Sequence, residues 1–317
     1  MKARILAALL AAALAAPGVA LMIGAGLAWS TGGIFVRNVS LADPWEIVLW
    51  RSVFMAAFLA VAIAAMNRGA LWSKVREAGG AGVISGLLLA STFFFFILSI
   101  TRNTVSNTLA LMSTGPFFVA IAGRLFLGER VPLRTWIAIG VALAGIAAMF
   151  LEGLQGGRTL GNLLALGVPT AFALNVIVLR HHHASVDMVP AVMLAGVFSI
   201  VVAAPFAWPL EAGARDMTVL ALMGVIQLGT GCLLMTLATR YLPASEIGLF
   251  ALIETTLGPV WAWLGVGERP TDLAIIGGLV VVAAVAANYL AGAWEARAAA
   301  LPTGGAGGSA ARSGRRA

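Results

Sequence analysis

The segment Leu125–Arg130, which reads LFLGER, returns 139 residues later as LGVGER at Leu264–Arg269. A proline follows each copy closely, at Pro132 and at Pro270. Each glycine before the Glu-Arg pair suits the end of a helix, and each proline suits the first turn of the next helix. The recurrence therefore predicts the same junction between two helices at two places in the chain.

A second pair of segments matches at nearly the same spacing. Gly33–Arg37 corresponds to Val176–Arg180, and each segment closes an apolar run with an arginine. Together the two matches divide the chain into related halves, at residues 18–151 and 161–292.

The composition of the chain places both halves in a membrane. Of its 317 residues, 61% are hydrophobic and 10% are charged, and the mean hydropathy is +0.98. Soluble domains carry about 25% charged residues, so this chain cannot cover a surface that faces water. That excludes a soluble enzyme, a nucleic-acid-binding domain and a disordered regulator. The net charge of +7 comes from Lys and Arg spread through loops and tail, which predicts a lipid bilayer and no nucleic acid as partner.

Apolar runs of about 20 residues, the length that crosses a hydrocarbon core as a helix, occur repeatedly along the chain. The ten expected spans are 18–36, 45–66, 80–100, 104–126, 133–151, 161–179, 188–208, 217–238, 243–265 and 271–292. Each half therefore has five spans, and because five is odd the second half must enter the membrane upside down. The sequence predicts an all-α polytopic membrane protein of ten transmembrane helices, built as two inverted five-helix repeats.

Inverted repeats are typical of secondary transporters, whose substrate site lies near the membrane midplane between the repeats. Gene duplication also builds membrane proteins that are not carriers, so the repeat favours a transporter without excluding other membrane proteins.

The distribution of Lys and Arg predicts the orientation. With the N-terminus inside, the inner segments collect thirteen of these residues and the outer segments five. This favours cytoplasmic positions for both termini of a multi-pass protein in a bacterial-type inner (plasma) membrane. Residues 1–17 resemble a secretory signal peptide, but cleavage would reverse the count, so we expect an uncleaved apolar extension. Residues 293–317 are small, flexible and basic, and we expect a disordered cytoplasmic tail.

Glu254 is the first candidate for a transport residue. It falls near the middle of the span at 243–265, where an ionised carboxylate costs at least ~2.5 kcal/mol. Either it carries a coupling proton or balances a substrate amine, or it is a protonated glutamate that makes a structural hydrogen bond between helices.

Arg51 is the second candidate. It lies seven residues past Pro44, which is about 10 Å along a helix and deep for a side chain that merely snorkels. Either Arg51 meets a substrate carboxylate bidentately, or it pairs with Glu46 on its own span.

Uncharged polar residues at mid-span depth form a further set of candidates. A cavity lined by hydroxyls, amides and an indole suits a small zwitterion or an amphipathic metabolite. Ser, Thr and Asn also hydrogen-bond between helices without touching any substrate, so both interpretations stay open. The set comprises Trp29, Ser30, Thr31, Asn107, Ser113, Thr114, Asn175, Thr255 and Thr256.

No pattern in the sequence points to catalysis, to a metal or to a cofactor. HExxH, P-loop and CxxC motifs are missing, and Cys232 has no second cysteine with which to pair. The three adjacent histidines at 181–183 point in different directions on any regular element. An intramembrane enzyme needs a nucleophile–base or metal constellation at one depth, which Glu254 alone does not supply.

In their order and spacing, the motifs resemble the EamA family of the drug/metabolite transporter (DMT) superfamily. The residues that carry the resemblance, over about 18–292, are Trp29-Ser30-Thr31, Trp50-Arg51-Ser52, Pro116 before Gly128-Glu129-Arg130, and Glu254–Pro259 before Gly267-Glu268-Arg269. The resemblance implies an exporter of amino acids or related metabolites. Pro116 and Pro259 do not align between the halves, which predicts an offset break in the second-half helix.

These observations predict a non-enzymatic carrier that moves a small polar metabolite by alternating access. We expect no cofactor and no metal, protons as a possible coupling ion, and a monomer or homodimer. The alternatives are an importer of a vitamin- or nucleoside-like metabolite and, in a different class, a non-transporting membrane scaffold or an intramembrane enzyme.

Overall fold

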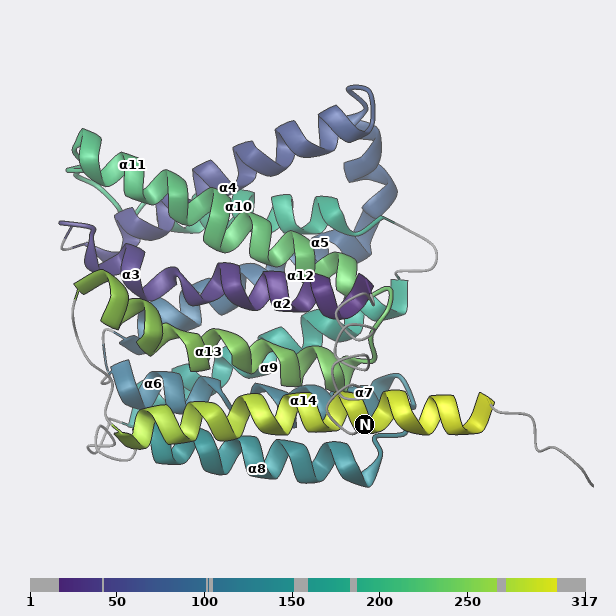
Figure 1. Ribbon diagram of the computed structural model, residues 1–317. Helices are drawn as coiled ribbons and strands as arrows, with labels where there is room; N and C mark the ends of the chain where they lie inside the picture. Colours follow the sequence, from purple (N-terminus) through teal and green to yellow (C-terminus); the bar gives the residue numbers. More distant parts are fainter. Residues whose placement is uncertain are drawn as a thin grey trace, which may run out of the picture.

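The computed structural model describes residues 17–41, 43–100, 102, 105–150, 159–182, 187–266 and 272–300, and these form a bundle of helices that run side by side (Figure 1). The helices of the first half are α2 (Pro17–Ser30), α3 (Gly32–Arg37), α4 (Pro44–Met66), α5 (Leu71–Ile100), α6 (Val105–Met112), α7 (Gly115–Phe126) and α8 (Leu133–Phe150). Those of the second half are α9 (Thr159–His182), α10 (Val189–Ala203), α11 (Ala214–Leu222), the π-helix η2 (Met223–Thr230), α12 (Gly231–Ala238), α13 (Ala244–Val266) and α14 (Asp272–Ala300).

These elements join into ten runs that correspond in order to the ten predicted spans. The pairs α2–α3 and α6–α7 and the series α11–η2–α12 each form one run, and every other helix is a run of its own. Within the described residues, seven runs are long and apolar enough to cross a membrane, and α8 and α10 contribute shorter apolar helices. The remaining run, α13, has 23 residues. At 1.5 Å per residue it is about 34 Å long, which is long enough for a hydrocarbon core of about 30 Å. The chain is an all-helical polytopic membrane protein.

The packing of the helices repeats between the halves. Three helices pack on their own counterparts, in the pairs α4–α10, α7–α13 and α8–α14. The remaining close pairs come in matched sets: α5–α9 with α2–α12, α5–α10 with α4–η2, and α7–α9 with α2–α13. A pseudo-two-fold axis produces this matching, because it carries each contact onto its counterpart. The prediction of two inverted five-helix repeats is confirmed.

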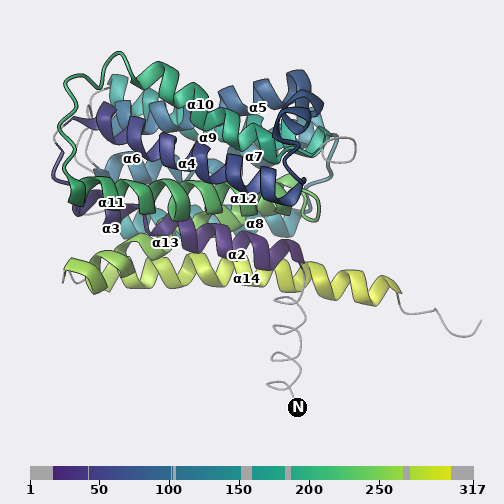
Figure 2. The same cartoon turned by 90° about the horizontal axis from the view of Figure 1, so that it is seen from above.

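The even number of runs returns the chain to the side from which it started. The first residues of α2 and the last residues of α14 lie at the same end of the bundle, on the right of Figure 1. We call this end the Pro17 end. Figure 2 shows α14 along one edge of the bundle, extending beyond the other helices at the Pro17 end. The helix α14 continues to Ala300, so residues 293–300 are helical where a disordered tail was expected. Residues 1–16 and 301–317 lie outside the described residues.

Two first-half spans break near their middles, and the second-half helix predicted to break does not. Thr31 separates α2 from α3, and its hydroxyl donates to the carbonyl oxygen of Ala28 at 2.6 Å. Ser113 and Thr114 separate α6 from α7, directly before Pro116. By contrast, α13 continues through Pro259 without interruption, so the expected offset break is wrong. Helices in membranes tolerate proline because neighbouring groups satisfy the freed carbonyl.

Small residues allow the self-paired helices α8 and α14 to approach closely. A Cβ atom added to Gly145 of α8 would lie 2.8 Å from the carbonyl oxygen of Gly277 on α14. The same pair of helices shares a buried hydrogen bond at 2.9 Å between the hydroxyl of Thr135 and the amide oxygen of Asn288. Close backbone contact supplies the packing energy that water cannot supply inside a bilayer.

Replacing Gly145 by leucine is expected to destabilise the bundle, because the new side chain meets backbone that cannot yield. Overpacking of this kind costs about 1–3 kcal/mol, which thermal unfolding in detergent would detect as a lowered melting temperature. Gly140→Leu is the matched control, since Gly140 is exposed on the same helix and an added Cβ there meets nothing within 4 Å. Equal melting temperatures for the two variants would contradict the close approach of α8 and α14.

Candidate transport site

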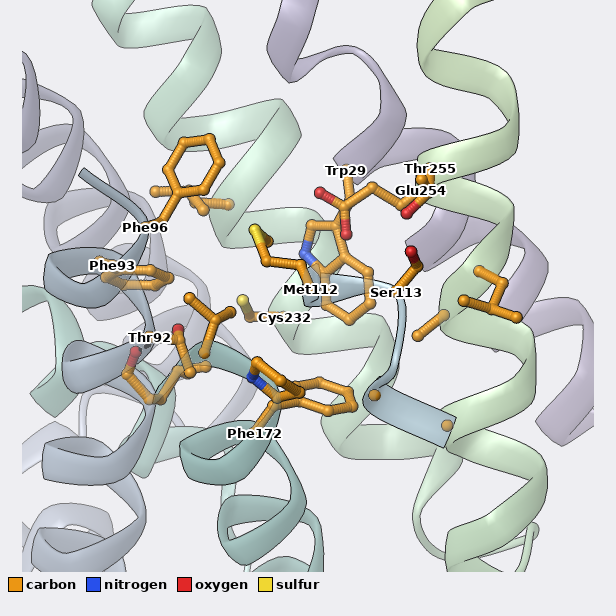
Figure 3. Close-up of a pocket in the computed structure, with 18 of the residues that line it drawn as sticks. Trp29, Thr92, Phe93, Phe96, Met112, Ser113, Phe172, Cys232, Glu254 and Thr255 are labelled. Carbon is orange, nitrogen blue, oxygen red and sulfur yellow. Dashed lines mark hydrogen bonds between the residues drawn. The ribbon is translucent and has the colours of Figure 1, made fainter. Parts of the chain in front are cut away.

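A cavity of about 150 Å³ lies between the two halves of the bundle (Figure 3). Helices α2, α4 and α5 and the α6–α7 break supply the first-half wall, and α9, η2, α12 and α13 supply the second-half wall. Its lining residues are Trp29, Arg51, Leu89, Thr92, Phe93, Phe96, Met112, Ser113, Gly115, Pro116, Val168, Pro169, Phe172, Gln227, Leu228, Cys232, Gly248, Ala251, Leu252, Glu254 and Thr255.

The wall of the cavity is mainly apolar and aromatic. The rings of Trp29 and Phe172 meet edge to face, with centroids 6.2 Å apart, and Phe93 and Phe96 cover the α5 side in Figure 3. Apolar walls exclude water and strengthen the electrostatic interactions of any charge placed among them. The charged side chains of the lining, those of Arg51 and Glu254, therefore dominate its chemistry.

Arg51 is buried in the wall, and no carboxylate among the described residues forms an ion pair with it. Its side chain is on α4 with 3% of the residue exposed, and its guanidinium carbon lies 5.5 Å from the centroid of the Phe93 ring. Among the described residues, its Nε and Nη2 atoms have no hydrogen-bond partner. A buried cation without a counter-ion is strongly unfavourable, so this side of the cavity is suited to an anion.

The alternative pairing of Arg51 with Glu46 is not formed. The carboxylate of Glu46 instead accepts hydrogen bonds from the indole of Trp50 at 3.2 Å and from the backbone N–H groups of Glu211 and Ala212 at 3.0 and 2.9 Å. The physical reason is helix geometry, since residues five apart do not face each other as residues three or four apart do. Glu46 thus fixes the segment that precedes α11.

Glu254 and Thr255 lie on α13, across the cavity from Phe93 in Figure 3, with Trp29 and Met112 between them. Glu254 is partly exposed to the cavity. Within the described part of the chain, no ion pair joins its carboxylate to Arg51 or to any other cation. The cavity therefore holds one positive and one negative group that do not neutralise each other.

The other predicted site residues take structural positions. Ser30 donates to the Leu27 carbonyl oxygen and accepts from the Trp261 indole, both at 2.7 Å. Asn175 is fully buried between α9 and α5, where its amide oxygen accepts from the Ser85 hydroxyl at 2.6 Å. Of the predicted residues, the cavity brings together Trp29, Arg51, Ser113, Glu254 and Thr255. Ser30, Thr31, Thr114, Asn175 and Thr256 do not line it, and the Asn107 side chain lies outside the described residues.

Gln227 is a lining residue that sequence reasoning missed. It lies on η2, and its Oε1 atom is buried without a hydrogen-bond partner among the described residues. Its amide nitrogen packs against Gly32, where an added Cβ would come within 2.4 Å. The available signal was an amide in the middle of an apolar span, just before Gly229 and Gly231. Short π-helical segments are frequent at functional sites.

An ion-pair network ties four runs together at the Pro17 end. The carboxylate of Glu129, after α7, accepts from Arg180 Nε of α9 at 2.8 Å and from the backbone N–H of Ala244 of α13 at 3.0 Å. Arg180 Nη1 donates to the Thr239 carbonyl oxygen at 3.0 Å and also to that of Leu242. One carboxylate and one guanidinium therefore hold helices of both halves together here.

Removing the charge of this network is expected to weaken the Pro17 end. Glu129→Gln takes the carboxylate away from the half-buried Arg180 guanidinium and from the Ala244 N–H, at a cost of about 1–3 kcal/mol. Glu295→Gln is the matched control, because Glu295 pairs with Arg134 at the same end but its side chain is 67% exposed, against 16% for Glu129. Thermal unfolding in detergent measures both, and a larger effect for Glu295→Gln would contradict this ranking.

The fold and the site define a class. A bundle of two inverted membrane repeats around a cavity with fixed charges is the architecture of secondary transporters. The chain belongs to the EamA-like transporter family, which matches residues 16–151 and 159–290, one match for each half. The protein is therefore a membrane transporter and not an enzyme, and the resemblance described from the motifs is confirmed.

Individual relatives agree with this assignment. The chain is 26% identical over 281 residues to the pseudopaline exporter CntI of Pseudomonas aeruginosa, covering 84% of this chain and 94% of that one. It is 25% identical over 217 residues to the uncharacterized transporter YdfC of Bacillus subtilis, covering 64% and 69%. One solved crystal structure has a TM-score of 0.75 at 14% identity, covering 89% of this chain and 98% of that one, and so shares its fold.

Proposed function

We propose that this transporter exports a small polar metabolite, an amino acid or a related compound, across the bacterial inner membrane by alternating access. The observation that carries the proposal is that Arg51 and Glu254 both line one cavity between the halves and, among the described residues, form no ion pair with each other. Arg51 requires an anion, and Glu254 requires a cation, which is either a proton or a substrate amine. Amino acids supply these charges on one small molecule.

The size of the cavity also favours a small cargo. Its volume of about 150 Å³ is below the roughly 300–1,000 Å³ of pockets that take drug-sized ligands. Its aromatic and aliphatic walls accommodate the apolar part of a metabolite, while the charges hold its polar part.

The direction of transport rests on a different support. One relative that aligns with most of the chain carries the name of an exporter.

The excess of Lys and Arg at the Pro17 end supports a cytoplasmic location of both termini, by the bias of membrane proteins towards basic cytoplasmic loops.

The test is transport by the purified full chain in liposomes. Uptake of labelled amino acids is measured with and without a pH gradient, against empty liposomes. Uptake of any amino acid above the empty liposomes supports the proposal, and acceleration by the gradient assigns protons as the coupling ion. No uptake of any amino acid by folded protein would overturn it and move nucleosides, vitamins and organic cations to the front.

Replacing Glu254 by glutamine is expected to abolish transport or to remove its response to the pH gradient, because the amide cannot exchange a proton or balance an amine. Glu77→Gln is the control, since Glu77 is an exposed carboxylate on α5 that pairs with Lys74 outside the cavity. Wild-type rates and an unchanged pH response in Glu254→Gln liposomes would remove Glu254 from the mechanism.

A further inference from the structure

A groove of about 220 Å³ lies between α7 and α9, separate from the transport cavity. The residues directly before two of its lining positions, Pro116 and Pro169, line the transport cavity instead. Each helix therefore has one face on the cavity and a neighbouring face on the groove. Because α7 belongs to the first half and α9 to the second, the groove is a seam between the halves. Its lining includes Phe117, Ile121, Leu125, Thr170, Ala173 and Leu174.

The surface of the groove is suited to hydrocarbon. Phe117, Leu125 and Leu174 are exposed although they are large and apolar, and Ala173 is buried beneath them. Thr170 is exposed as well, but its hydroxyl donates to the carbonyl oxygen four residues earlier at 2.8 Å. No hydroxyl hydrogen is then left for a polar occupant. In a membrane-spanning bundle, such a groove accommodates an acyl chain and not a water-soluble molecule.

Two basic side chains lie at one end of the groove. Arg124 is exposed on α7, three residues past Ile121, and so shares its side of the helix. His181 is exposed on α9, seven residues or nearly two turns past Leu174, and so lies on the same face. Both helices run towards the Pro17 end, where Glu129 after α7 meets Arg180 of α9. The groove is therefore apolar along its length and basic at the Pro17 end.

Both basic groups are placed to meet a ligand from the membrane. Within the described part of the chain, Arg124 takes part in no ion pair. The ring of His181 packs edge to face on His182, with centroids 4.9 Å apart. Nδ1 of His182 lies 3.0 Å from the Val178 carbonyl oxygen, which fixes this pair of rings at the end of α9. Basic sites between membrane helices bind the head groups of anionic lipids.

From these contacts we propose that the α7–α9 groove binds an anionic phospholipid, with an acyl chain along the groove and the phosphate head group at Arg124 and His181. The positive charge at the Pro17 end selects a lipid with a net negative charge over a zwitterionic one. The site goes beyond the proposed function because the lipid is not the cargo. A chain that lies on α7 and on α9 touches both halves, so the lipid joins them from the membrane side.

The first experiment measures lipid binding to the full chain in detergent by native mass spectrometry. Palmitoyl-oleoyl phosphatidylglycerol is compared with palmitoyl-oleoyl phosphatidylcholine, which has the same chains and no net charge. The anionic lipid is expected to bind at least about fivefold more tightly, the factor that one basic residue near the membrane surface contributes. Phosphatidylglycerol with a diazirine on one acyl chain is expected to cross-link to residues 117–126 and 170–174. Glycerol 3-phosphate, which lacks the chains, is expected not to displace the lipid.

Variants of the basic end test the head-group contact. Arg124→Gln and His181→Gln are each expected to weaken phosphatidylglycerol binding several-fold and to leave phosphatidylcholine binding unchanged. Arg76→Gln is the matched control, because Arg76 is exposed on α5 and does not line the groove. It loses the same charge and is expected to keep the wild-type preference.

A filled groove tests the acyl-chain contact. Thr170→Trp places a large ring in the groove and is expected to remove the cross-links and to weaken binding of both lipids. Leu163→Trp is its control, because Leu163 lies seven residues earlier on the same face of α9, is 63% exposed and lies outside the groove.

Four outcomes would overturn the proposal. They are equal affinities for the two lipids, an unchanged preference in folded protein that carries both Arg124→Gln and His181→Gln, cross-links spread evenly over the lipid-facing helices, and displacement of the lipid by glycerol 3-phosphate. A dimer that Thr170→Trp dissociates would also overturn it and assign the groove to a second copy of the chain. None of these measurements involves transport, so each leaves the carrier function standing.

Discussion

Five membrane crossings in each half force the second half to enter the bilayer in the opposite direction from the first, and the rest of the structure depends on this constraint. Because the halves are inverted, three helices meet their own counterparts running the other way, in the pairs α4–α10, α7–α13 and α8–α14. Small residues make these contacts close, with Gly145 directly on the backbone of Gly277. The cavity lies between the halves, lined by the α6–α7 break and Gly115 of the first half and by η2 and Gly248 of the second.

The cavity and the Pro17 end use charge in different ways. At the Pro17 end, Glu129 and Arg180 satisfy each other together with backbone groups, and so they hold α7, α9 and α13 together. In the lining of the cavity, which is mainly apolar, Arg51 and Glu254 form no ion pair with each other. An ion pair stabilises one arrangement of the helices. Two buried charges that do not pair each lack a counter-ion, which a ligand or a proton can supply. This difference separates the groups that support the bundle from those that serve transport.

The hydropathy of the sequence predicted the ten runs, and the odd number of spans in each half predicted their inversion, because both depend only on where apolar segments begin and end. Depth along a span also came from the sequence, which is why Trp29, Arg51, Glu254 and Thr255 were among the candidates that line the cavity. The sequence did not predict which face of a helix a residue occupies. Asn175 also lies at mid-span depth, but its amide oxygen accepts from Ser85 of α5 and the residue does not line the cavity. Gln227 was missed although its amide lies in the middle of the predicted span 217–238, at a depth that would have marked it as a candidate. Glu46 found backbone partners in a loop that no periodicity describes.

The self-paired helices also bear on the ancestry of the chain. A contact between a helix and its own counterpart is isologous, as in a symmetric dimer, so a gene for one half could build this bundle only from two copies inserted in opposite orientations. Such a gene could not carry a strong excess of basic residues on one side, because that excess would orient every copy alike. Fusion removes the conflict, since the five crossings of the first half fix the opposite entry of the second half. Each half can then accumulate its own loop charges and its own cavity residues, such as Arg51 in one and Glu254 in the other.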